Sequence, residues 1–320
     1  MEQRRKDPLI ILAGPTGVGK SETAVLLAQK IGGEVVSADS MQVYRAMDIG
    51  SAKITKGEMC GVPHHLLDVA DPTEAFDAAR YQELAKKVLS EIYGRGHLPI
   101  LCGGTGFYIQ AVTRDIDFSE GDADPALREE LLSYASANGN EALHEKLRQM
   151  DSEAADSIHP NNVKRVIRAI EYYQIVGESI CRHNEREAAK PSPYNLLQFV
   201  LTDDREKLYR RIDARVDAMM EAGLLDEVQY LAAMGCRRDM VSMQGLGYKE
   251  LLDYLDGKVD LAEAVRIIKR DSRHYAKRQE TWFRREKDAI WLRRSDFENT
   301  EAVAAFMAKV ARERFDLPCR

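Results

Sequence analysis

The eight residues GPTGVGKS, positions 14–21, constrain the fold more than any other part of this 320-residue sequence. They match the pattern G-x-x-x-x-G-K-[ST], with the apolar run LIILA before them and a helical pattern after them. Glycines at these positions let backbone N–H groups converge on phosphate oxygens at the positive end of a helix. Lys20 adds a cation, and the Ser21 hydroxyl suits Mg²⁺. The sequence therefore predicts a phosphate-binding loop made of Gly14, Pro15, Thr16, Gly17, Val18, Gly19, Lys20 and Ser21.

Short apolar runs recur at residues 9–13, 34–38 and 98–102, and stretches with helical periodicity separate them. That alternation is typical of a parallel sheet in an α/β protein. The run LLQFVLT, residues 196–202, predicts a further strand. We expect four helices after it, at about residues 204–222, 223–235, 247–256 and 260–283.

The pattern changes near residue 114 to polar helical sequence, and no strand candidate follows before residue 196. We interpret this stretch as an insertion into the α/β core. The predicted parts are residues 1–113 as the first part of the core, residues 114–195 as an α-helical insertion, and residues 196–320 as the remainder of the core with a helical region.

Composition limits the classes of function. The formal net charge is −6, so a surface for nucleic acid must be local. No apolar run approaches the roughly 20 residues of a membrane span, and no signal peptide precedes the first strand, so we expect a cytoplasmic protein. The cysteines contain no C-x-x-C pair, which argues against a zinc ribbon and a disulfide framework; they are Cys60, Cys102, Cys181, Cys236 and Cys319.

The phosphate-binding loop alone does not show which reaction the protein catalyses. P-loop ATPases carry a strand that ends in an acidic metal ligand. Here the candidate strand at residues 98–102 runs into Gly103, Gly104 and Thr105 without a carboxylate. Asp39 is the carboxylate that follows a core strand, at the edge where open α/β sheets bind ligands. We therefore interpret Asp39 as a general base or a metal partner.

Five segments occur in an order that resembles the tRNA dimethylallyltransferase family, of the bacterial type. They are GPTGVGKS, VVSADSMQVYR, PHHLLDVADPTEAFDAARY, LCGGTGFYIQA and RHYAKRQETWFR. The resemblance implies a P-loop NTPase-like core with a helical insertion. It also implies transfer of a dimethylallyl group from dimethylallyl diphosphate to N6 of the adenosine 3′-adjacent to the anticodon of a tRNA. We expect a monomer that requires Mg²⁺ and has no membrane partner.

The resemblance also implies roles for single residues. Asp39 matches the family's base and Thr105 a hydroxyl near the reacting centre. Lys20, Mg²⁺ at Ser21 and Arg215 would neutralise the leaving diphosphate, with Arg211 as the competing arginine. The positions implied to contact tRNA are Asp39, Ser40, Met41, Gln42, Thr105, Arg128, Lys164, Arg165, Arg168, Gln244, Gly247, Tyr248, Lys249, Arg273, Lys277 and Arg278.

A basic stretch supports the RNA interpretation independently of the resemblance. Residues 264–294 contain eleven Lys and Arg against four Asp and Glu, in a protein that is acidic as a whole. Helical spacing places five of the cations on one face, which predicts a footprint for phosphates. These five are Arg266, Arg270, Arg273, Lys277 and Arg284.

Other interpretations stay open at this point. An adenylate isopentenyltransferase would share the donor but prenylate a free nucleotide, and the insertion and basic stretch argue against it. A small-molecule P-loop kinase and a non-enzymatic RNA-binding module are further alternatives. His64, His65 and Asp68 form a possible metal set, but adjacent histidines rarely face one ion, so we expect a structural role for them.

Overall fold

The computed structural model describes residues 6–118 and 125–318. The chain divides into two compact units. The first comprises Met1–Thr113 and Pro193–Arg320, and the second comprises Arg114–Ser192. Cys319 lies outside the described residues, and the other four cysteines are free thiols. No helix of the described residues is long and apolar enough to cross a membrane.

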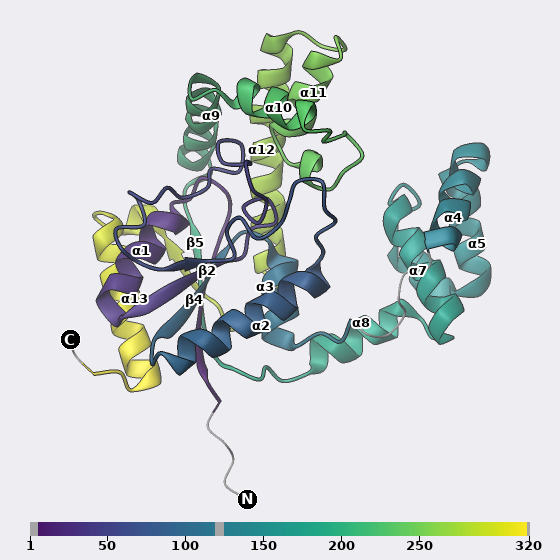
Figure 1. Ribbon diagram of the computed structural model, residues 1–320. Coiled ribbons are helices and arrows are strands. Elements are labelled where there is room, and N and C mark those ends of the chain that lie inside the picture. The colour runs from purple at the N-terminus through teal and green to yellow at the C-terminus, as the bar shows by residue number, and fades with distance from the viewer. Residues whose placement is uncertain (1–5, 119–124, 319–320) are drawn as a thin grey trace, which may run out of the picture. The chain divides into compact units, whose positions relative to one another are not determined.

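The described residues of the first unit form a six-stranded sheet in the order β3-β2-β4-β1-β5-β6, and each neighbouring pair is parallel (Figure 1). The predicted α/β fold class is therefore confirmed. The four predicted strands are also confirmed, with boundaries that differ by at most one residue. The strands are β1 (Pro8–Ala13), β2 (Gly33–Ser37), β3 (His64–His65), β4 (Leu98–Gly103), β5 (Asn195–Thr202) and β6 (Ile290–Arg293).

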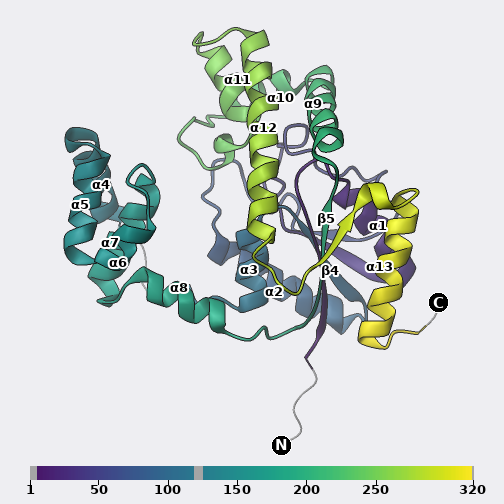
Figure 2. The ribbon, with the colours of Figure 1, turned by 180° about the vertical axis from the view of Figure 1, so that it is seen from behind.

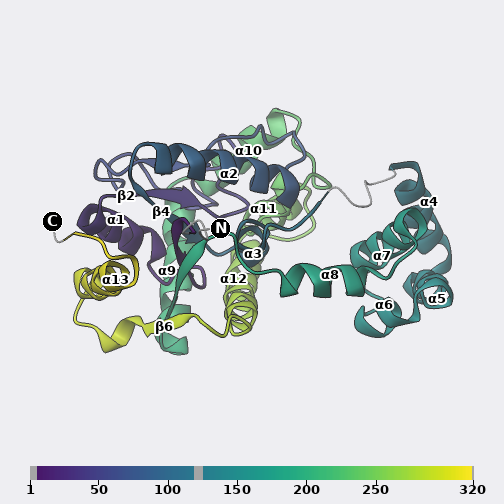
Figure 3. The same ribbon diagram turned by 90° about the horizontal axis from the view of Figure 1, so that it is seen from below.

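Helices cover both faces of this sheet because the side chains of its central strand alternate between them. Leu9, Ile11 and Ala13 belong to the core on the side of α2, whereas Ile10 and Leu12 pack on the side of α1 and α13. Figure 3 shows α1 and α13 side by side on their face. The helices are α1 (Lys20–Ile31), α2 (Ala78–Gly94), α3 (Gly106–Arg114), α9 (Arg205–Glu221), α10 (Leu224–Ala233), α11 (Tyr248–Leu255), α12 (Leu261–Phe283) and α13 (Thr300–Phe315).

The helix α12 runs without interruption over 23 residues, and Figure 2 shows it beside the sheet from behind. Asp260 caps its first turn by accepting a hydrogen bond from the backbone N–H of Glu263. One face of the helix is buried, through Ile268, Ala276 and Phe283. The basic residues lie on the opposite face of the helix, which is not buried.

The regular secondary structure among the described residues of the second unit consists of helices. Its core consists of apolar side chains at helical spacing, among them Leu131, Leu143, Leu147, Val166 and Ile170. The helices are α4 (Pro125–Asn138), α5 (Asn140–Met150), α6 (Ser152–Ser157), α7 (Val163–Val176) and α8 (Ile180–Ala189).

Candidate active site

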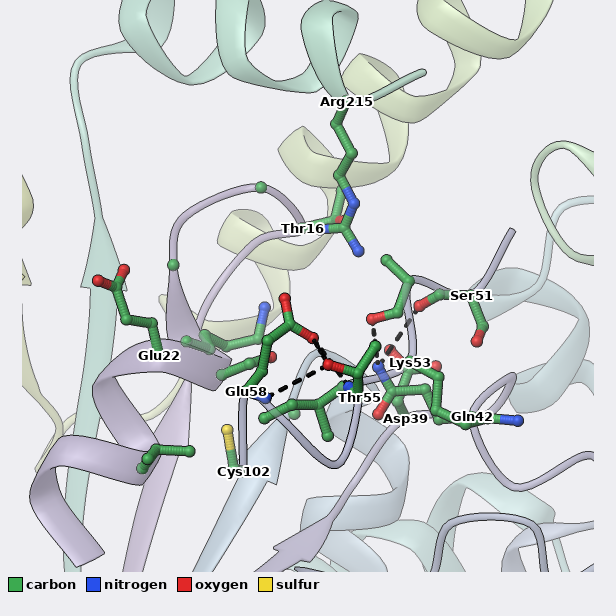
Figure 4. A pocket seen from close by; sticks show the side chains of 18 of the residues that line it. Thr16, Glu22, Asp39, Gln42, Ser51, Lys53, Thr55, Glu58, Cys102 and Arg215 are labelled. Carbon is green, nitrogen blue, oxygen red and sulfur yellow. Dashed lines mark hydrogen bonds between the residues drawn. The ribbon is translucent and has the colours of Figure 1, made fainter. Parts of the chain in front are cut away.

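A cavity of about 980 Å³ lies at the carboxyl edge of the sheet and joins residues that are far apart in sequence. The phosphate loop forms one wall, and the segment after β2 forms another. Arg215 points into the cavity from α9 (Figure 4). Its lining includes Thr16, Gly17, Gly19, Lys20, Ser21, Asp39, Gln42, Ser51, Lys53, Thr55, Glu58, Cys102, Arg215, Tyr275 and Gln279.

The backbone of the phosphate loop requires its glycines. Gly17 has a φ of 77° and Gly19 a φ of 98°, in the left-handed region that L side chains rarely adopt. A Cβ on Gly14 would lie 2.5 Å from the carbonyl oxygen of Leu201 on β5. Gly19 also forms the N-cap of α1, so the loop ends at the positive end of that helix. This is the backbone geometry of an anion-binding loop.

Two half-buried cations, Lys20 and Arg215, face this loop. Burial lowers the pKa of Lys20 to about 8, although Cys102 and Asp39 oppose that shift. The Lys20 ammonium donates a 2.8 Å hydrogen bond to the carbonyl of Pro15. Burial likewise holds the pKa of Arg215 below its usual value. A bound polyanion would stabilise the charged form of both groups.

The structure separates the two arginines that compete for this role. Arg215 lines the cavity. Arg211, one turn earlier on α9, instead forms a 2.6 Å ion pair with the buried carboxylate of Asp203. The geometry therefore favours Arg215 over Arg211 as the ligand of an anion in the cavity.

Asp39 and Thr105 lie close together because β2 and β4 are parallel neighbours whose carboxyl ends meet. The Asp39 carboxylate accepts a 2.9 Å hydrogen bond from the backbone N–H of Met41. The Thr105 hydroxyl accepts a 3.0 Å hydrogen bond from the N–H of Ser40, the residue after Asp39. The turn that carries Asp39 and the turn that carries Thr105 are thus joined by a hydrogen bond, with Asp39 on the cavity wall.

Gln42 and Met41, two further residues predicted to contact tRNA, are held by contacts within the protein. The Gln42 side chain accepts a hydrogen bond from the Ser37 hydroxyl at 3.0 Å and also contacts the carbonyls of Ser51 and Ala52. Met41 packs against the turn at Gly245, where a Cβ would lie 2.7 Å from its sulfur. The segments around Met41 and Gly245 therefore meet, as a common contact surface for RNA requires.

The structure corrects the prediction for Tyr248. Its side chain is 0% exposed, and its hydroxyl donates a 2.8 Å hydrogen bond to Glu227, so the ring offers no surface to RNA. Gly247 is also buried, and its N–H donates to the Glu250 carboxylate at 2.9 Å. Gln244 is exposed, and Lys249 is half-buried beside Glu250. Of this predicted contact segment, Gln244 and Lys249 keep accessible side chains.

The basic residues of α12 fall into two groups. Those nearer its N-terminus are paired with acids: Arg266 with Glu263, Lys269 with Asp217, Arg270 with Asp271 and Arg273 with Asp213. Lys277 and Arg278 near its C-terminus, and Arg284 and Arg285 just after it, have no acidic partner among the described residues. A hollow of about 500 Å³ lies among His274, Lys277, Arg278, Thr281, Trp282 and Arg285.

This division corrects the predicted stripe. The free positive charge is concentrated at one end of α12, and the face that carries Arg266, Arg270 and Arg273 is largely neutralised by ion pairs. Sequence spacing fixes the face of a helix but does not show which acids of other helices reach it, such as Asp213 and Asp217 from α9.

The predicted cations of the second unit lie on α4 and α7. Arg128 forms a two-pronged ion pair with Glu171, a carboxylate that is 0% exposed, at 2.7 and 2.9 Å. Lys164 and Arg165 are exposed on α7, and Arg168 lies over the Tyr172 ring. Arg128 therefore has a structural partner already, whereas Lys164 and Arg165 present their charge to solvent.

Several cavity residues were not predicted. Lys53 is 6% exposed, and its ammonium bonds to Asp48, Asp68 and the carbonyl of Tyr44, each within 2.8 Å. Glu58 accepts hydrogen bonds from the N–H and hydroxyl of Thr55 at 2.8 and 2.7 Å. These side chains shape the segment after β2, and their polar sequence resembles an ordinary surface loop.

Both histidines of the pair make hydrogen bonds within the protein, and that of His64 joins its Nδ1 to the carbonyl oxygen of Val62 at 2.9 Å. His65 lies on the edge strand β3 and hydrogen-bonds at 2.6 Å to Glu34, a carboxylate that also binds Arg95 and His97. The described residues contain no group of three or more His, Cys, Asp or Glu side chains that could hold a metal ion.

A P-loop core whose phosphate loop faces a carboxylate and two half-buried cations in one cavity defines the class of P-loop α/β transferases. A family model described as IPP transferase matches residues 42–286, which is more than half of the chain. The chain therefore belongs to the IPP transferase family.

Curated relatives agree with this assignment. The tRNA dimethylallyltransferase of Lachnoclostridium phytofermentans is 52% identical over 307 residues, covering 96% of this chain and 98% of the relative. A protein of the same name from Halalkalibacterium halodurans is 50% identical, covering 91% and 92% of the two chains.

Solved structures agree as well. The tRNA isopentenylpyrophosphate transferase of Bacillus halodurans superposes with a TM-score of 0.73 at 46% identity, covering 97% of this chain and 99% of that one. A eukaryotic dimethylallyltransferase acting on tRNA superposes with a TM-score of 0.80 at 28% identity, covering 98% and 81%.

Proposed function

We propose that this chain is a tRNA dimethylallyltransferase. It transfers the dimethylallyl group of dimethylallyl diphosphate to N6 of the adenosine 3′-adjacent to the anticodon. The observation that carries the proposal is that one cavity holds an anion-binding loop with Lys20 and Arg215 on one side and Asp39 on another. The relatives' names give the tRNA and the dimethylallyl group, and this cavity offers a site for each half of the proposed reaction.

In the donor half of the reaction, the diphosphate must leave the allyl group. The bond between C1 of the allyl group and the diphosphate oxygen breaks, and the diphosphate leaves with the bonding electrons. Backbone N–H groups of the loop, Lys20 and Arg215 stabilise the charge that develops on that oxygen. Because these groups are already in place on the cavity wall, they need little rearrangement as the bond breaks.

The acceptor half requires removal of a proton. The N6 amine of adenine is a weak nucleophile, so Asp39 accepts its proton as the new C–N bond forms. The Met41 N–H, bound to Asp39 at 2.9 Å, fixes the carboxylate for this transfer. Thr105 lies on the adjoining turn, where its hydroxyl can orient the amine. The products are N6-dimethylallyladenosine in the tRNA, inorganic diphosphate and a proton.

Mg²⁺ is part of the proposal. Ser21 follows Lys20 on the cavity wall, and a single hydroxyl fits a small cation that takes its other ligands from substrate phosphates and water. When bound, the ion would supply further neutralisation of the leaving diphosphate. The chain's own contribution at this position is the Ser21 oxygen at the start of α1.

The tRNA surface follows from the accessible charge. The target adenine is stacked in its loop and must be extruded to reach Asp39. Lys277 and Arg278 on α12 would bind phosphates next to the cavity. Residues 114–195 would grip the anticodon stem-loop, mainly through Lys164 and Arg165. We further propose that the protein acts in the cytoplasm as a monomer.

One assay tests this function against its rivals. The protein is incubated with Mg²⁺ and dimethylallyl diphosphate labelled in the allyl group, together with tRNA, AMP or ATP in separate reactions. Label in tRNA alone, without any nucleoside triphosphate, is the expected result. Label in AMP or ATP would indicate an adenylate isopentenyltransferase. A requirement for ATP with release of ADP would indicate a kinase.

A further inference from the structure

Gln279 on α12 connects the phosphate loop to the turn that follows β4. Its side-chain oxygen accepts a 2.8 Å hydrogen bond from the backbone N–H of Thr16. Its side-chain nitrogen donates a 3.0 Å hydrogen bond to the carbonyl of Gly104. The side chain is 6% exposed and lines the cavity. The two bonds span elements that lie 263 and 175 residues away along the chain.

The N–H of Thr16 and the carbonyl of Gly104 determine which side chain can bind both at position 279. An N–H must be met by an acceptor and a carbonyl by a donor, and a side-chain amide offers both. An ionised carboxylate has no donor for Gly104, and a thioether provides neither bond of ordinary strength. The fit is close: a Cβ on Gly104 would lie 2.1 Å from the Gln279 nitrogen. The glycine leaves the space that this amide fills.

The bond to Thr16 changes the interpretation of the phosphate loop. One N–H of the loop is held by the protein rather than offered to a phosphate. The other bond ends at Gly104, the residue before Thr105, whose hydroxyl is tied to the turn of Asp39. Gln279 therefore stands between the part of the cavity that holds the leaving group and the part that holds the base.

We propose that Gln279 is a positioning residue that sets the distance between the diphosphate held by the phosphate loop and the Asp39–Thr105 pair. It acts through Thr16 and Gly104 and takes no part in proton or group transfer. The proposal rests on the proposed prenyl transfer. A misplacement of reacting groups by about 1 Å costs up to about 10²-fold in rate, so this residue controls the rate of transfer more than the affinity for either substrate.

The test uses Gln279→Met, which removes both hydrogen bonds, and Gln279→Glu, which keeps the acceptor for Thr16 and loses the donor to Gly104. Single-turnover transfer is measured with saturating dimethylallyl diphosphate and tRNA, and binding of each substrate is measured by titration. We expect at least a tenfold loss in the transfer rate of both variants. Each dissociation constant should change less than threefold in Gln279→Met, whereas the added carboxylate of Gln279→Glu should also weaken donor binding by repelling the diphosphate.

A matched control is Gln82→Met. Gln82 on α2 is also a buried glutamine, 8% exposed, with a 2.7 Å hydrogen bond to the carbonyl of Ala111, and it does not line the cavity. This variant should lose a comparable amount of thermal stability and keep the wild-type transfer rate. If it slows transfer as much as Gln279→Met does, the loss reflects general destabilisation and the positioning role is wrong.

Two further outcomes would overturn the proposal: wild-type transfer rates in both Gln279 variants, or, in the uncharged Gln279→Met, a rate loss matched by an equal loss of donor affinity. Gln279→Glu is nearly the same size as the native residue, so it remains informative if Gln279→Met does not fold. The proposed function fails separately, because it fails when the wild-type protein transfers no label to tRNA.

Discussion

The hydroxyl of Tyr248 donates a 2.8 Å hydrogen bond to the carboxylate of Glu227 on α10. The same carboxylate accepts hydrogen bonds of 2.8 to 3.0 Å from the backbone N–H groups of Asp48, Ile49 and Gly50. One side chain thus satisfies four donors. Because Asp48 and Ile49 line the cavity, Glu227 holds one of its walls against the core.

Replacement of Glu227 by Gln should destabilise the protein by about 1–3 kcal/mol, because the amide nitrogen turns a donor toward backbone N–H groups that need an acceptor. Equilibrium unfolding in urea would measure the change. Asp226→Asn is the control, since Asp226 is the exposed neighbour on α10 and its replacement should change stability by no more than about 0.5 kcal/mol. Equal effects of the two substitutions would contradict a specific role for Glu227.

The sequence predicts the sheet well because each central strand is a short apolar run next to a glycine or an aspartate. It does not predict β3 and β6, which are only two and four residues long and contain polar side chains. The helix α13 was also missed, although its buried residues Val303, Met307 and Ala311 follow helical spacing. Local patterns are weakest at sheet edges, where pairing with a neighbour determines the structure.

The candidate site shows the same limit. The phosphate loop and Asp39 could be predicted because strand ends converge at one edge of a parallel sheet. Gln279 could not, because its partners Thr16 and Gly104 are joined to it only by the packing of α12. The burial of Tyr248 and the ion pairs of Arg128 and Arg273 depend on distant side chains in the same way.

Asp39→Asn tests the proposed base. The amide keeps the shape of the side chain but cannot accept the N6 proton, so the single-turnover rate should fall by at least about 10²-fold. The affinity for tRNA should change little, because the lost function is needed only during transfer. A variant that transfers at near the wild-type rate would exclude Asp39 as the base.

The lowered pKa of Glu34 should make the stability of the protein depend on pH. Hydrogen bonds from Arg95, and then from His65 and His97, lower its pKa to about 2 from an ordinary 4.5, and burial opposes this shift. A lowered carboxyl pKa gives stability that is complete above pH 4.5 and is lost as the pH falls toward 2. Glu34→Gln should therefore cost about 3 kcal/mol at pH 7.

The same substitution should cost clearly less stability at pH 3, because part of the stabilisation by the ionised Glu34 carboxylate is already lost there. Urea unfolding at both pH values would measure the two differences. Glu83→Gln, at an exposed position of α2, serves as the control and should show no such trend. A pH-independent cost for Glu34→Gln would mean that the carboxylate's charge does not contribute.

Lys20 predicts how donor binding depends on pH. Its pKa of about 8 means that the free protein carries the charge below that pH and loses it above. Bound diphosphate favours the charged form, so binding above pH 8 must take up a proton. The dissociation constant for dimethylallyl diphosphate should be flat up to about pH 7.5 and rise toward tenfold per unit above about pH 8.5.

Calorimetric titration at pH 8.5 in two buffers with different ionisation enthalpies would count the protons taken up. Lys20→Met should bind the donor more weakly and lose the pH dependence, because the titrating group is gone. A wild-type dissociation constant that stays constant from pH 7 to pH 9.5 would contradict the assignment of Lys20 as a diphosphate ligand.

The free cations of α12 give the most direct test of the tRNA surface. Lys277 and Arg278 have no acidic partner among the described residues, whereas the equally exposed Arg266 and Arg270 are paired with Glu263 and Asp271. An unpaired cation releases counterions from RNA when it binds a phosphate. The double variant Lys277→Gln/Arg278→Gln should therefore lower the slope of log K against log salt by roughly one unit per contact, and somewhat less where the RNA is single-stranded.

The matched double variant Arg266→Gln/Arg270→Gln removes the same charge from the same helix, but those arginines are already neutralised by neighbours. It should shift the salt slope much less, and donor binding should be unchanged in both variants. Equal slopes for the two variants would show that position on α12 does not matter and that net charge alone attracts the RNA. An unchanged slope in the Lys277/Arg278 variant would move the phosphate contacts to α7, where Lys164 and Arg165 are exposed.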